Sequence, residues 1–266
     1  MRIDTTECIA TEGPRKPTGD SHKDRPSRRF QFAANYTWSK AVGMAANDDS
    51  GLSEPAPAFR ALNRAVLNFD RTQNLQLQGM GELPFGKGRS LANSWSAAAV
   101  LGGWRLNGIA SFMTGLPFYV SSSGSSLNMP GATQRANQIK PNVQILGNIG
   151  STASYFDPLA FAPVTAATFG NVGFNSLRGP GVVNTDVAIS RDFTITERFK
   201  AQFRFESFNF LNTPHFGLPN TNVSNMVLNG DQTIKNLGGY STITSTQNLG
   251  RDFDERRIQF DLRISF

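Results

Sequence analysis

The chain ends in RRIQFDLRISF (Arg256–Phe266), in which polar and apolar side chains alternate without exception after Arg256. A period of two residues places successive side chains on opposite faces of a β-strand. The stretch therefore predicts a strand with one apolar face and one polar face. The apolar face carries Ile258, Phe260, Leu262, Ile264 and Phe266, and the polar face carries Arg257, Gln259, Asp261, Arg263 and Ser265.

Five upstream segments show the same alternation, with clear exceptions at Met80, Ile109 and Arg191. Each has about 9 to 11 alternating residues, the length that a tilted strand needs to cross a bilayer. We therefore expect an all-β chain with about six long antiparallel strands. The segments are RRFQFAANYTWS (28–39), NLQLQGMGELPF (74–85), GWRLNGIASF (103–112), NTDVAISRDF (184–193) and ERFKAQFRFES (197–207).

The composition favours strands and turns over helices. The 266 residues include 21 Phe, 25 Gly and 14 Pro. The net charge is +6, but the basic residues are dispersed and no nucleic-acid-binding motif accompanies them, so we expect no nucleic-acid partner. Cys8, His22 and His215 are too few for a soft-metal cluster, and we expect no metal and no other cofactor.

The connections between the predicted strands alternate in length. Residues 40–70, 115–183 and 212–255 form long connections, whereas residues 86–103 and 194–197 form shorter ones. Long connections without secondary structure are uncommon in compact soluble domains. Outer-membrane barrels combine short periplasmic turns with long extracellular loops. The alternation therefore predicts a transmembrane barrel segment whose long connections lie outside the cell.

Aromatic residues fall at the ends of the predicted strands. Transmembrane strands carry such aromatic girdles at both membrane interfaces. The expected periplasmic girdle contains Phe85, Trp104, Phe193, Phe199 and Phe266, and the opposite girdle contains Tyr36, Trp38 and Phe112.

The polar faces of the last two predicted strands carry long charged side chains. Such charges suit a water-filled or plugged barrel lumen. Alternation alone also fits a soluble β-sandwich, which remains an alternative. The residues that we expect to face the lumen are Lys200, Arg204, Glu206, Asp261 and Arg263.

Several motifs resemble known outer-membrane proteins. GELPFGKGRS, LGGWRLNGIASFMTGLPFYV, YFDPLAFAP, FGNVGFNSLRGPGVVNTDVAISRDF, FRFESFNFLNTPHFG and ITSTQNLGRDFDERRIQFDLRISF resemble, in this order, the C-terminal part of Oar-like TonB-dependent transporters. The resemblance extends from Arg28 to Phe266. The final strand is also similar to the terminal strand that the barrel-assembly machinery reads. The assembly signal would then comprise Phe260, Leu262, Ile264 and Phe266.

The resemblance implies an outer-membrane barrel of about 22 strands with a plugged lumen. Such a transporter takes up a ligand, for example a glycan or a metal chelate, with energy supplied through TonB. Six strands form an incomplete barrel, because eight is the usual minimum. We expect residues 28–266 to be C-terminal barrel strands, and residues 1–27 to be a disordered or misassigned start without a secretory signal. TonB would be contacted only through an N-terminal part that this sequence lacks.

The stretch GELPFGKGRS (Gly81–Ser90) nearly matches a phosphate-binding loop. That motif requires Ser or Thr after its Lys, and this chain has Gly88 there. The motif also requires a strand before the glycines and a helix after them, whereas Gly81 lies inside a predicted strand. We therefore interpret Gly86–Arg89 as a periplasmic turn.

Acidic residues cluster at Asn47–Gly51 and at Asp252, Asp254 and Glu255. Neither cluster has the spacing of a calcium loop, so we expect solvated loop charges. His215 is expected to lie in a loop near the extracellular rim, without a catalytic role. We identify no catalytic residue and expect no enzyme.

The expected location is the outer membrane of a Gram-negative type bacterium. The expected partners are outer-membrane lipid, the barrel-assembly machinery and an unknown extracellular ligand. A second hypothesis is a binding or adhesion module whose outer loops recognise a ligand without transporting it.

Removal of Phe266 is expected to reduce assembly of the parent barrel, because this residue ends the terminal strand. The measurement is the amount of folded barrel in the outer-membrane fraction. Unchanged insertion would contradict the assembly-signal interpretation.

Overall fold

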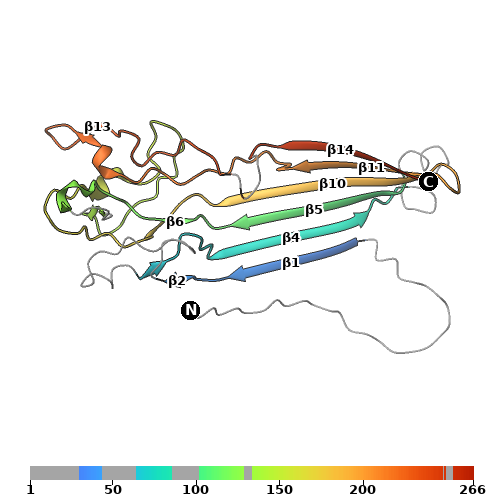
Figure 1. Cartoon of the computed structure of the whole chain (residues 1–266), viewed down its shortest axis with the longest axis horizontal. Coiled ribbons are helices and arrows are strands. Elements are labelled where there is room, and N and C mark those ends of the chain that lie inside the picture. Colours follow the sequence, from blue (N-terminus) through green and yellow to red (C-terminus); the bar gives the residue numbers. More distant parts are fainter. Residues whose placement is uncertain (1–29, 44–63, 86–101, 129–133, 248, 250–253) are drawn as a thin grey trace, which may run out of the picture.

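The computed structural model contains a long open β-sheet with connecting segments gathered at one end (Figure 1). The sheet has six antiparallel strands, and all six predicted strands are present. In spatial order they are β1 (Phe30–Trp38), β4 (Gln73–Glu82), β5 (Trp104–Met113), β10 (Val182–Thr194), β11 (Lys200–Phe208) and β14 (Arg257–Ser265). The structure describes residues 30–43, 64–85, 102–128, 134–247, 249 and 254–266.

The spatial order of the long strands follows their order in the chain. The fold is therefore an antiparallel meander, as expected for a barrel segment. β1 and β14 are the two edges of the sheet, so the barrel is not closed. β10 has the weakest alternation in sequence but is the longest of the six strands, with 13 residues.

Short elements occupy the connections between the long strands. The short strands are β2 (Val42–Gly43), β3 (Ala65–Val66), β6 (Pro117–Phe118), β7 (Asn137–Gln138), β8 (Phe161–Ala162), β9 (Leu177–Arg178), β12 (Val227–Leu228) and β13 (Ile234–Asn236). The 3-10 helices are η2 (Gly124–Leu127), η3 (Pro158–Ala160) and η4 (Val223–Asn225). Within the described ranges, no helix is long and apolar enough to cross a membrane.

The strand register assembles the apolar side chains on one face of the sheet. Phe205 lies opposite both Ile189 and Phe260, so one apolar row crosses three strands. This face is uncovered: Phe32 is 61% exposed and Phe260 is 67% exposed. No second sheet packs on it in the part of the chain that the structure describes. The exposed apolar rows do not form the packed interface between two sheets that the soluble β-sandwich alternative requires.

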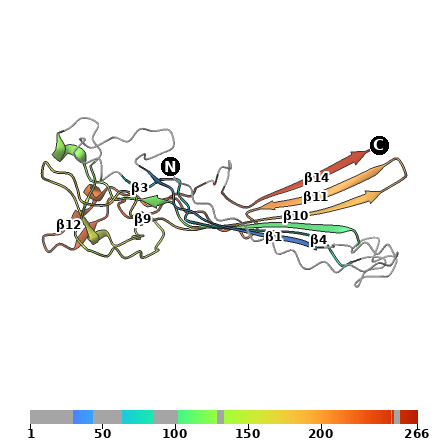
Figure 2. The same cartoon turned by 90° about the horizontal axis from the view of Figure 1, so that it is seen from below.

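The two ends of the sheet differ in the way predicted from loop length (Figures 1 and 2). At one end β10 and β11 are joined by a tight turn, in which the N–H groups of Ile195 and Thr196 both donate to the carbonyl oxygen of Phe199. The C-terminus lies at this end. The described parts of the three long connections lie at the opposite end.

Two of the long connections, between β5 and β10 and between β11 and β14, fold together into a compact body. We call this body the loop module (the described parts of residues 114–181 and 209–247). Its centre is Phe156, whose ring lies 5.6 Å from that of Phe118, 5.9 Å from that of Phe161 and 5.5 Å from that of Tyr240. Both connections contribute to this hydrophobic core. Its buried residues are Phe118, Val120, Ala136, Tyr155, Phe156, Ala160, Phe161, Val172, Val223, Tyr240 and Ile243.

The two ends of the connection between β5 and β10 approach each other unusually closely. A Cβ atom at Gly115 would lie 1.9 Å from the carbonyl oxygen of Gly179, so only glycine fits at position 115. Gly179 N–H donates to the carbonyl oxygen of Leu116. The two ends of this long connection therefore meet at the base of the loop module.

Replacing Phe156 with Ala is expected to destabilise the loop module by about 3–5 kcal/mol, because it removes a fully buried ring from the core. The measurement is the rate at which an external protease cleaves the module in intact outer membranes. Ile139→Ala is the matched control, since Ile139 lies in the same module and is 62% exposed. Equal cleavage rates for the two variants would contradict a packed core.

Candidate functional site

The five residues predicted to face the lumen lie together on the polar face of β11 and β14. The register places Arg204 opposite Asp261, and Gln202 opposite Arg263. Arg204 forms an ion pair of 2.5 Å with Glu206 on the same strand. Lys200 and Arg263 line a shallow hollow of about 250 Å³ in this face. The structure thus brings the charges together, and their role in a lumen stays a prediction.

The ion pairs on this face are partly solvated. Half of the Arg204 side chain is exposed, and so is a similar fraction of the Arg105 side chain, which pairs with Asp192 at 3.0 Å. Exposed ion pairs contribute little to stability. The charged side chains of the polar face are therefore in contact with water, and their ion pairs add little to the stability of the sheet.

Asp70 and Arg178 join two long connections at the loop-module end of the sheet. Asp70 is 2% exposed, and its Oδ2 lies 2.5 Å from Nη2 of Arg178. The other Asp70 carboxylate oxygen accepts from the backbone N–H of Ala41 at 2.7 Å. Arg178 also donates to the hydroxyl of Thr72 at 2.6 Å. Hydrogen bonds from several donors offset the cost of removing a carboxylate from water. Loss of one donor leaves part of that cost uncompensated and destabilises the fold.

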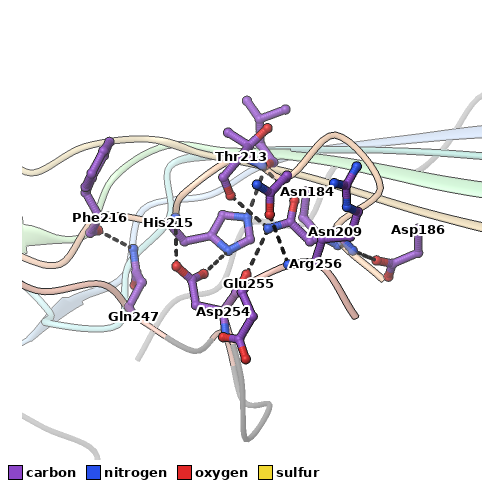
Figure 3. A network of polar contacts seen from close by, with 12 residues as sticks. Asn184, Asp186, Asn209, Thr213, His215, Phe216, Gln247, Asp254, Glu255 and Arg256 are labelled. Carbon is purple, nitrogen blue, oxygen red and sulfur yellow. Dashed lines mark hydrogen bonds and ion pairs between the residues drawn. The ribbon is translucent and has the colours of Figure 1, made fainter. Parts of the chain in front are cut away.

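His215 and Asp254 form a second buried contact (Figure 3), which closes the connection between β11 and β14 at its base. The His215 side chain is 4% exposed and the Asp254 side chain 10%. Nδ1 of His215 lies 2.5 Å from Oδ1 of Asp254, and the His215 backbone N–H donates to Oδ2 at 3.2 Å. Nε2 lies 3.1 Å from the carbonyl oxygen of Val183 in β10. A carbonyl oxygen can only accept, so in a hydrogen bond at this contact Nε2 is the donor.

Asn209 completes this junction (Figure 3). Its backbone N–H donates to Oδ1 of Asp186 in β10 at 3.0 Å. Its side-chain amide donates to the carbonyl oxygens of Thr213 and Asp254, and its Oδ1 accepts from the Thr213 N–H at 2.9 Å. A left-handed φ of 47° lets the chain turn sharply here. Through these contacts, both ends of the connection between β11 and β14 are held against β10.

The environment of Asp254 differs from the one expected from the sequence. This residue was expected to be a solvated loop charge, but it is buried against His215 because the chain returns to the sheet at this point. No local signal connects the two residues, which are separated by 39 positions. His215 does lie at the loop end of the sheet, as expected, although it is buried.

None of the other candidate sites from the sequence forms a nucleotide or metal site among the described residues. Gly81 pairs with Phe30 and Leu106 inside the sheet, so the strand required before a phosphate loop already contains its first glycine. Gly86–Arg89, Asn47–Gly51, Asp252, Cys8, His22 and residues 1–27 lie outside the described residues. Among the residues that are described, no group of three or more His, Cys, Asp or Glu is arranged to hold a metal ion.

Burial changes the acidity of groups inside the loop module. It raises the pKa of the Tyr240 phenol above its usual range, and the nearby Asp157 carboxylate adds to the effect. Burial also lowers the pKa of Arg135, whose Nη1 donates to the carbonyl oxygen of Val172 at 3.4 Å. The raised pKa keeps the Tyr240 phenol neutral, so this side chain acts as part of the packed core.

A family model for the outer membrane beta barrel domain matches residues 21–259. The chain belongs to this family, as the open antiparallel meander and its uncovered apolar face indicate. It is therefore a protein of the outer membrane of Gram-negative bacteria. No curated protein and no solved structure matches the chain.

Replacing His215 with Ala is expected to loosen the connection between β11 and β14, because it leaves the Asp254 carboxylate buried without its partner. Breaking a buried pair in this way costs about 3–5 kcal/mol. The measurement is hydrogen exchange of residues 209–247 in the folded protein. Lys235→Ala, at an exposed position of the same connection, is the control. Identical exchange in both variants would count against a structural role for the pair.

Proposed function

We propose that this chain is the C-terminal barrel part of an Oar-like TonB-dependent transporter that takes up a ligand such as a glycan or a metal chelate. The observation that carries the proposal is the loop module: the long connections gather at one end of the sheet and form one packed body there. Loops held by a rigid scaffold are the usual place for ligand recognition. The loop module is accordingly the part that meets the extracellular ligand.

In this proposal the short turns face the periplasm and the loop module faces the outside. The apolar face of the sheet contacts lipid, which explains why rings such as Phe32 and Phe260 are exposed. The polar face with Lys200, Arg204 and Asp261 lines the lumen and faces the plug.

The sheet edges support a larger barrel. A strand edge in hydrocarbon leaves backbone groups without partners, which is too costly to persist. In this proposal the free edges of β1 and β14 pair with further strands of a complete barrel. The TonB contact belongs to an N-terminal part of the same parent protein. The barrel-assembly machinery reads Phe260, Leu262, Ile264 and Phe266 during insertion.

We assign binding and transport, rather than catalysis, to this protein. The buried His215–Asp254 contact is the strongest candidate for chemistry among the described residues. Both ring nitrogens of His215 already face acceptors, which are the Asp254 carboxylate and the Val183 carbonyl. Neither nitrogen is directed at an open substrate site. The His215–Asp254 contact therefore holds the connection between β11 and β14 to the sheet.

A second candidate is a binding or adhesion module without transport. The separate hydrophobic core of the loop module favours it, because such a core gives an ordered binding surface without any movement in the barrel. The two candidates differ in their dependence on TonB.

A strain that lacks the gene is expected to lose growth on one member of a panel of glycans and iron chelates, and a strain that lacks TonB is expected to lose growth on the same compound. The measurements are growth and accumulation of the labelled compound. Loss of surface binding without any TonB-dependent growth defect would favour adhesion and contradict transport.

Excision of the connection between β5 and β10, which is one of the two parts of the loop module, gives a sharper comparison. Gly115 and Gly179 meet at the base of the connection, so residues between them can be replaced by a short turn without stretching β5 or β10. The shortened parent protein is expected to reach the outer membrane and to lose uptake. Normal uptake by the shortened protein contradicts ligand recognition by this module.

A further inference from the structure

Two large apolar side chains, Met80 of β4 and Ile109 of β5, lie on the polar face of the sheet. Met80 is 50% exposed and Ile109 is 49% exposed. The register places Met80 opposite Asn107 and Ile109 opposite Gln78, so the two apolar residues lie diagonally across neighbouring strands, within reach of each other's long side chains. Apolar surface in contact with water is unfavourable. A lumen filled with water therefore gives no reason for this pair.

Met80 and Ile109 line one hollow in this face, with a volume of about 410 Å³. The volume is within the range of small-molecule sites. Three side-chain amides, those of Gln31, Gln78 and Asn107, belong to residues that line the same hollow. The hollow therefore combines an apolar pair with several uncharged hydrogen-bonding groups.

The polar face of β1, β4 and β5 is almost uncharged along its length. The charged residues of these three strands are Glu82 and Arg105, which lie opposite each other at the end of the sheet that is remote from the loop module. Towards the loop module, the hollow is followed by a row of uncharged polar residues across four strands. This row consists of Asn35, Gln76, Ser111 and Asn184.

The charge next to this hollow on β10 is acidic. Asp186 lies opposite Ile109, and its Oδ1 accepts from the backbone N–H of Asn209 at 3.0 Å and from the side-chain amide of Asn184 at 3.3 Å. The residues that line the hollow include no Lys or Arg. An anionic ligand would therefore lose water here without meeting a cation, which is costly.

We propose that Gln31, Gln78, Met80, Asn107 and Ile109, which together we call the amide wall, bind a neutral oligosaccharide. A side-chain amide has two donors and one acceptor group, so it can form hydrogen bonds with neighbouring hydroxyl groups of a sugar ring. The apolar pair suits the C–H face of such a ring, because contact removes apolar surface of both partners from water.

The inference rests on the proposed function, because the polar face must line the lumen for a transported ligand to reach it. It also narrows that function, since it selects a glycan over an anionic metal chelate. Cations that could hold such a chelate lie elsewhere on the polar face: Lys200 and Arg263 belong to β11 and β14, and Arg105 is paired with Asp192.

Ligand binding is measured with outer-membrane vesicles from cells that produce the protein, and vesicles from cells that lack the gene give the background. The probes are radiolabelled neutral hexasaccharides of glucose, xylose and mannose, the anionic hexasaccharide of galacturonic acid, and ferric citrate. We expect saturable binding of a neutral hexasaccharide. We expect no saturable binding of the two anionic probes.

Two variants test the two kinds of contact in the amide wall. Gln78→Ala is expected to weaken binding of the neutral hexasaccharide about tenfold, the size of one or two neutral hydrogen bonds. Met80→Gln is expected to weaken it as well, because it replaces apolar contact surface with a polar group. If Gln78→Ala lowers the amount of protein in the vesicles, Gln78→Glu takes its place, since it keeps the length of the side chain and loses the amide donors.

Gln259→Ala is the matched control. Gln259 is on the polar face of β14, opposite Glu206, and lies in the same row across the sheet as Met80 and Asn107. The control therefore removes the same amide at the same depth of the barrel but away from the amide wall. It is expected to leave the affinity for the neutral hexasaccharide unchanged.

Stronger binding of an anionic probe than of every neutral hexasaccharide would overturn the inference, and so would equal affinities in the Gln78→Ala and Gln259→Ala variants. TonB-dependent uptake of ferric citrate without binding of any neutral hexasaccharide would overturn this inference and leave the transport proposal intact. Binding of a neutral hexasaccharide that is weakened by Gln78→Ala, without any TonB-dependent uptake, would support the amide wall and contradict transport.

Discussion

In the hydrocarbon of a membrane, every backbone N–H and C=O group needs a partner within the protein, and this requirement shapes the whole chain. Six long strands meet it by pairing with their neighbours in a simple meander. The irregular connections cannot meet it in the same way, so the long ones lie beyond one end of the sheet. Among the six strands, β1 and β14 are the edges of the sheet, and their outward-facing backbone groups have no partner strand within it.

The same residue type has opposite roles in the two parts of the molecule. In the sheet, Phe260 is 67% exposed, because lipid takes the place of a protein core. In the loop module, Phe156 is fully buried among other aromatic rings, because this part is surrounded by water. The chain thus contains one apolar surface built for lipid and one hydrophobic core built for water.

Buried ionic contacts lie where these two parts meet. Asp70 with Arg178, and His215 with Asp254, each join segments that are far apart in the chain. The Asp70 and Asp254 carboxylates in these contacts are well supplied with hydrogen-bond partners, so removing one partner costs more than the contact itself contributes. They fix the base of the loop module to one end of the sheet, which gives its surface a defined position relative to the strands.

The sequence by itself determined the six strands, the apolar and polar faces, and the end at which the long connections lie, because a period of two and the length of a connection are local properties of a chain. It did not determine the core around Phe156 or the burial of Asp254, because these depend on contacts between residues with no local signal. It marked Arg191 only as an exception to a pattern. Only the tertiary structure placed that cation beside the Trp104 ring of β5, because strand register decides which side chains of neighbouring strands come together.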